Sequence, residues 1–103
     1  MTTLKTFLLD NEEKLNMYTT AISKVHVGNH PEVHEVKALY EEILAEVKQE
    51  ADATVLTQAF DRLATVTNHY EIPGDTCETF AAVYKDLENA LNLAFSLDEN
   101  VLV

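Results

Sequence analysis

Residues that interrupt or cross-link a chain are scarce in this sequence. Its 103 residues include two glycines, two prolines, one cysteine and no tryptophan. A single cysteine cannot form a disulfide within the chain, so the fold must rest on an apolar core, and the cytoplasm is the simplest compartment. The glycines and prolines fall in two short clusters, Gly28 with Pro31 and Pro73 with Gly74, which leaves long glycine-free stretches between them.

Positive charge is also scarce. Seven basic residues stand against 18 acidic ones, which gives a net charge of −11 with neutral histidines. Arg62 is the only arginine and the lysines are scattered, so nucleic acid and anionic membrane surfaces are disfavoured as partners. No apolar run approaches the roughly 20 residues that span a bilayer, and the N-terminus lacks the layout of a secretion signal. We therefore expect no nucleic-acid partner and no membrane association.

The apolar content predicts one folded domain spanning residues 1–103. Apolar residues make up 47% of the chain, and a domain of this size buries roughly two thirds of its unfolded surface, enough for one core. Outside the two glycine and proline clusters the apolar residues recur at the helical period, and no long stretch alternates as a strand would. The sequence therefore predicts an all-α fold, most simply an up-down-up-down four-helix bundle.

Capping residues and prolines mark where the helical segments begin. Asp10 with Glu13 indicates a start inside the first segment, which leaves open whether it is one helix or a short turn followed by a longer helix. Pro31 opens the second segment and Asp52 caps the third. The fourth begins near Asp75, with a glutamate at the capping-box spacing.

The predicted core combines the apolar stripes of these segments. Val25 ends the first stripe and Val55 opens the third. Cys77 opens the fourth, where a buried structural cysteine is favoured over a reactive thiol at a helix N-terminus. The second stripe is the clearest, and it consists of Val33, Val36, Leu39, Tyr40, Ile43, Leu44 and Val47.

Three histidines are spaced by four residues, at His26, His30 and His34. On one continuous helix this spacing would align them for metal binding, but the glycine and proline between them predict a turn. His26 then closes one helix and His34 lies in the first turn of the next. Two interpretations stay open, which are solvated loop histidines and a partial metal site at one end of the bundle.

Motifs for catalysis are missing. The sequence has neither a glycine-rich phosphate loop nor a serine or cysteine nucleophile elbow. It also offers no carboxylate pair whose surroundings predict separated pKa values. An enzymatic function therefore has no support in the sequence.

Two segments carry distinctive residue patterns. Val25–Val33 combines valine-histidine, glycine and histidine-proline-glutamate, and Thr67–Phe80 combines asparagine, tyrosine, proline, cysteine and threonine-phenylalanine. The first resembles the valine-histidine-glycine-x-x-histidine-proline-glutamate stretch of the RIC family, the hemerythrin-like di-iron proteins implicated in repair of iron–sulfur centres. The second is similar to that family's asparagine-tyrosine, proline, cysteine, threonine-aromatic signature, which leads into the last helix. With the segment 97–102, the resemblance runs from about residue 20 to the end of the chain.

The resemblance implies a hemerythrin-like bundle that holds an oxo-bridged di-iron site and restores clusters damaged by nitric oxide or peroxide. It places His26 among the iron ligands, with Glu50 and Asp98 as carboxylates at approximate positions. The family's histidines in the last helix correspond here to Asn92, Ala94 and Ser96. The expected function is therefore iron–sulfur cluster repair or iron handling, with a reduced metal site or one shared across a homodimer.

An alternative interpretation keeps the bundle and removes the metal. A metal-free four-helix bundle would act as a protein-interaction or regulatory module, through its acidic faces or its apolar tail. The tail ends in Val101–Val103, an apolar run on an otherwise acidic chain that could seed a dimer. This alternative predicts no bound iron and a specific protein partner or self-association.

Overall fold

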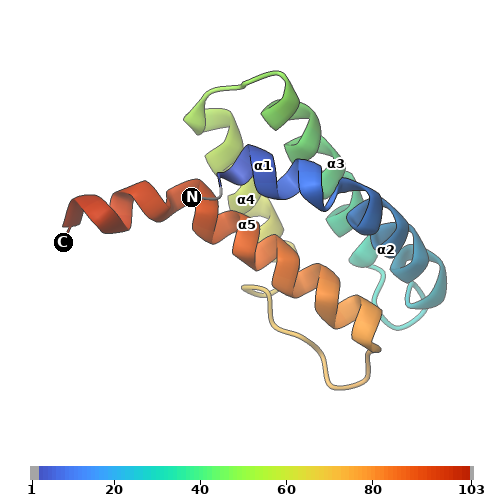
Figure 1. The fold of residues 1–103 in the computed structure, drawn as a ribbon. Helices are drawn as coiled ribbons and strands as arrows, with labels where there is room; N and C mark the ends of the chain where they lie inside the picture. The colour runs from blue at the N-terminus through green and yellow to red at the C-terminus, as the bar shows by residue number, and fades with distance from the viewer. Residues whose placement is uncertain (1–2, 103) are drawn as a thin grey trace.

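The protein is described by a computed structural model that covers residues 3–102, with side chains through Phe95. Within this range it consists of helices and contains no strand, so the predicted all-α class is confirmed (Figure 1). No helix in the same range is long and apolar enough to cross a membrane. The helices are α1 (Leu4–Asp10), α2 (Glu12–Val25), α3 (Val33–Lys48), α4 (Ala53–Val66) and α5 (Glu78–Leu102).

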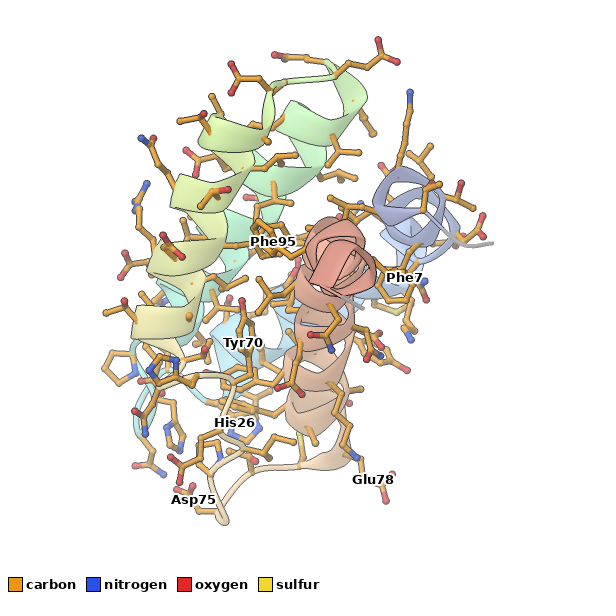
Figure 2. The ribbon with its side chains drawn as sticks, turned by 90° about the vertical axis from the view of Figure 1, so that its left-hand side faces the viewer. Phe7, His26, Tyr70, Asp75, Glu78 and Phe95 are labelled. Carbon is orange, nitrogen blue, oxygen red and sulfur yellow. The ribbon has the colours of Figure 1, made fainter. Side chains whose placement is uncertain are left out.

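The first segment is two helices, which settles the question that the sequence left open. Asn11 separates them, because its backbone and side-chain amides both donate to the carbonyl of Phe7, at 3.1 and 2.8 Å. These bonds complete the last turn of α1 and let the chain change direction. As a result α1 packs across α3 and α5, and Phe7 lies on the side of α1 that faces α5 (Figure 2).

From α1 to α4, helices that follow one another along the chain are in contact. α2 packs against α3 and α3 against α4, while α5 returns to pack against α2 (Figure 1). The α3–α4 turn is tight, with Glu50 in a left-handed conformation at a φ of 56°. Asp52 caps α4 as predicted, since its Oδ1 accepts a hydrogen bond from the Val55 amide at 3.2 Å.

The core lies between the helices, and α3 is its central contributor. All seven residues of the predicted α3 stripe are buried, as the helical spacing indicated. Tyr40 is fully buried, and its hydroxyl donates to Asn16 Oδ1 at 2.8 Å. This hydrogen bond satisfies the polar end of the ring, and burial raises the pKa of Tyr40 to about 12.

Three residues of the predicted stripes are exposed, and each lies at a helix end. Val25 is 73% exposed because it is the last residue of α2, and Val55 is 38% exposed in the first turn of α4. Cys77 is exposed just before α5, so the preference for a buried cysteine was wrong. A periodic stripe fixes the direction of a side chain but not how far the neighbouring helices reach.

The C-terminal end of α5 runs past the other helices (Figure 1). Asp98, Val101 and Leu102 belong to this end, but their side chains lie outside the part that the structure describes, as does the whole of Val103. The predicted role of the apolar tail in assembly therefore stays a prediction.

Truncation of a core leucine should destabilise the bundle strongly. Leu63 is fully buried on α4, so Leu63→Ala should lower the free energy of unfolding by about 2–5 kcal/mol through lost burial and the cavity left behind. The control Val25→Ala, at an exposed position, should change it by less than about 0.5 kcal/mol. Urea denaturation followed by circular dichroism measures both, and equal losses would contradict this placement of the core.

Candidate functional site at the loop end of the bundle

Two loops that are distant in sequence meet at one end of the bundle. One joins α2 to α3 and the other joins α4 to α5. His26 Nε2 lies 3.1 Å from Cys77 Sγ, and His30 Nε2 lies 2.9 Å from Asp75 Oδ1. Figure 2 shows His26 behind the loop that carries Asp75 at its tip. The segments 25–33 and 67–80 thus contact each other.

The first loop packs against the side chain of Phe80. Phe80 is fully buried in the first turn of α5. The rings of His26 and His30 pack against it, with centroid distances of 5.2 and 5.4 Å. A backbone hydrogen bond of 2.7 Å from the His30 amide to the His26 carbonyl closes the turn that brings both imidazoles to the same ring. The Phe80 ring also packs against the ring of Tyr84, with a centroid distance of 4.6 Å.

The second loop begins with three consecutive left-handed residues. Asn68, His69 and Tyr70 have φ values of 54°, 61° and 62°, a conformation that costs energy for residues with a Cβ. Thr67 holds the run in place, because its hydroxyl donates to the Leu63 carbonyl at 2.8 Å and accepts from the Tyr70 amide at 2.9 Å. This backbone conformation buries the Tyr70 ring between α4 and α5 (Figure 2).

His30 bridges the two loops through both of its ring nitrogens. Nδ1 lies 3.0 Å from Glu32 Oε2, while Nε2 contacts Asp75. Only the imidazolium cation has two N–H donors, so this double contact fits a protonated ring. The hydrogen bond that the Asp75 carboxylate accepts from His30 raises the pKa of His30, and the same bond lowers the pKa of Asp75.

A cavity of about 270 Å³ opens beside this bridge. It lies between the α2–α3 loop, the end of α4 and the α4–α5 loop, and Tyr84 of α5 forms part of its wall. Glu32 and Glu71 bring carboxylates to its lining, and Val66 and Pro73 bring apolar surface. The loop end therefore combines ionisable groups with a space that a small molecule can enter.

Two of the three predicted iron ligands, His26 and Glu50, lie far from each other, and the side chain of the third, Asp98, lies outside the described part of the structure. His26 lies at the loop end beside Cys77, whereas Glu50 lies beyond the other end of α3, whose 16 residues span roughly 24 Å. Glu50 pairs there with Lys5 at 3.6 Å. The side chain of Asp98 is among those not described.

The described side chains do not converge on a metal ion. Within that part of the chain, no group of three or more His, Cys, Asp or Glu residues is arranged to hold one. The buried polar residues Thr19, Ser23 and Thr67 each use the hydroxyl for a carbonyl of their own helix. Because His26 and Glu50 do not meet, these donors do not fit a complete di-iron centre within the described residues of one chain.

Sequence reasoning missed Asp75 and Glu32 as partners of His30, and Cys77 as the partner of His26. A signal was present, because the α2–α3 and α4–α5 connections lie at the same end of an up-down bundle. The glycine and proline clusters marked both connections. The side-chain pairing across them depends on the left-handed run at Asn68–Tyr70, which no spacing rule predicts.

The His30 bridge should make stability depend on pH in a defined direction. Its stabilising contribution is complete below the unfolded histidine pKa of about 6.5 and is lost as the pH rises through the raised folded value. Asp75→Asn should therefore lower the pKa of His30 and weaken this dependence, whereas Asp10→Asn, far from the loops, should do neither. A nuclear magnetic resonance titration of the His30 ring measures the shift, and an unchanged midpoint in Asp75→Asn would contradict the bridge.

Comparison with known proteins adds no identification. No protein-family model matches the chain, and neither a curated protein nor a solved structure shows a significant match. The functional argument therefore rests on the residues, their arrangement and the resemblance of the two loop segments.

Proposed function

We propose that this chain is a RIC-like protein with a hemerythrin-like four-helix bundle, which acts in iron–sulfur cluster repair or iron handling under nitrosative or oxidative stress. The observation that carries the proposal is the meeting of the two RIC-like segments. His26 contacts Cys77 and His30 contacts Asp75 across 51 and 45 residues of sequence. The resemblance therefore covers two parts of one structural unit, which supports a common architecture more strongly than two isolated matches would.

The helix packing also supports the bundle. α1 and α2 together occupy the place of a first helix that bends at Asn11, and α3, α4 and α5 follow as the second, third and fourth. The packing of α2 on α3, of α3 on α4 and of α5 on α2 gives three of the four neighbour contacts of an up-down-up-down bundle. At the fourth, the ring of Phe60 on α4 reaches the ring of Phe95 on α5, with a centroid distance of 6.1 Å. A protein of this type places its ligands on facing helices or at the bundle ends.

The metal site that we propose is reduced or shared. His26 lies at the loop end and matches a histidine ligand of the family. Cys77 beside it is a second side chain of a kind that binds iron. Two donors are too few for a stable site. A homodimer that joins two loop ends would bring four donors together, and Glu50 would then have no part in it.

A metal-free interaction module is the second candidate, and a specific observation favours it. The centre of the bundle is filled by large apolar and aromatic side chains, Tyr40, Phe60, Leu63 and Tyr84 among them, each no more than 1% exposed. Carboxylates and imidazoles that hold metals inside bundles project into this region. If no iron binds, the functional feature of the bundle would be its surface, with a net charge of −11 to attract a basic protein partner.

Iron loading separates the two candidates. Protein purified without chelator and then treated anaerobically with ferrous iron should bind iron at more than trace stoichiometry, measured by metal analysis and the optical spectrum. His26→Ala should lower the bound iron, because it removes the matched imidazole. His34→Ala is the control, since His34 is exposed on α3 and outside the contacts between the two loops.

Light scattering on the same samples tests sharing of the site. Iron that binds together with a doubling of mass supports a site shared by two copies, and iron that binds to a monomer supports a reduced site within one chain. Iron content near zero in the wild-type protein would overturn the iron-handling proposal and favour the interaction module. If the wild type and His26→Ala bind equal amounts of iron, His26 is not a ligand of the site.

A further inference from the structure

The cavity beside the His30 bridge has features that neither the bundle nor the proposed iron site explains. Its volume of about 270 Å³ is several times the roughly 30 Å³ that one water occupies in the liquid. It has room for a small organic molecule, and it opens to solvent between the two loops. The chemistry of its walls indicates which class of molecule would bind.

Tyr84 brings a hydroxyl group to the wall of this cavity. The residue is 1% exposed and lines the cavity, and its ring packs on Phe80. Among the described residues its hydroxyl has no hydrogen-bond partner, whereas the equally buried Tyr40 bonds to Asn16. Burial raises the pKa of Tyr84 to about 12, with a further contribution from the charge of Glu32, so the hydroxyl stays protonated. Buried polar groups without a protein partner bond to water or ligand.

The charge of the lining is negative. Glu32 and Glu71 supply carboxylates, and His30 is the one basic side chain that lines the cavity. The charge of His30 is already shared between Glu32 and Asp75, at 3.0 and 2.9 Å. Glu71 Oε2 accepts a hydrogen bond from the neutral side-chain amide of Asn68 at 2.6 Å, which leaves the charge of Glu71 without compensation from this partner. The cavity therefore favours a cation and disfavours an anion.

Apolar surface completes the lining and selects among cations. Val66 and Pro73 line the cavity together with the Tyr84 side chain. A bare metal ion gains nothing from such surfaces, whereas an alkyl chain does. An ammonium group can also donate to the Tyr84 oxygen and to carboxylates at once.

We propose that this cavity binds a small organic cation with a primary ammonium group, which sits between Glu71, Glu32 and the Tyr84 hydroxyl. The alkyl part of the molecule packs on Val66 and Pro73. The inference goes beyond the proposed function, because it uses neither iron nor His26. Its physical basis is the combination of a hydroxyl without a protein partner in the cavity wall, negative charge and apolar surface in one space.

Titration with butane-1,4-diamine tests the proposal on the full chain with a chelator present. Calorimetry should show saturable binding, and the backbone amide resonances of residues 66–71 should shift in the nuclear magnetic resonance spectrum. Butane-1,4-diol, which has the same length and no charge, should bind at least about tenfold more weakly. Glu71→Gln and Tyr84→Phe should each raise the Kd by about tenfold, because each removes one polar contact and keeps the side-chain shape.

Glu13→Gln is the matched control, since it removes the same charge from an exposed position on α2. Its Kd should equal that of the wild type, and unchanged circular dichroism of all variants shows that they fold. Equal binding of the diol, an equal effect of Glu13→Gln, or shifts reproduced by sodium or magnesium chloride at equal ionic strength would overturn the proposal. Because the chelator removes iron, the result is independent of the iron-loading experiment.

Discussion

The loop end of this protein depends on the burial of one aromatic ring. Phe80 lies at the start of α5 with no exposed surface, and His26, His30 and Tyr84 pack around it. An apolar ring in this place positions polar groups without competing for their hydrogen bonds. The imidazole nitrogens stay free to contact Cys77 and the carboxylates, and the two loops are brought to a common contact.

The negative charge of the chain gives this arrangement its electrostatic character. With 18 acidic and seven basic residues, most carboxylates have no cation to pair with. Lys14 pairs with Asp86 at 2.7 Å, and Lys48 with Glu12 at 3.0 Å. Among the described residues of the loop end, a histidine, His30, contacts the carboxylates in place of a lysine or arginine. The result is a histidine bridge with a raised pKa, which makes it sensitive to pH, beside a cavity lined by Glu32 and Glu71.

Left-handed backbone marks the places where packing overrides local preference. The run at Asn68–Tyr70 is unfavourable for residues with a Cβ, yet it buries the Tyr70 ring and directs the rest of the loop toward His30. Glu50 adopts a similar conformation in the tight turn between α3 and α4. Both strained sites lie in connections, where the helices that they join determine the path of the chain.

The sequence by itself determined the helices and much of the core. The apolar spacing in α3 predicted every buried residue of its stripe, and Asp52 predicted a cap, because helical periodicity and capping are local properties. The tertiary structure alone decided the exposure of Val25 and Cys77 and the partners of His30. These features depend on how far neighbouring helices reach and on how two distant loops meet, and no local pattern in the chain encodes either distance.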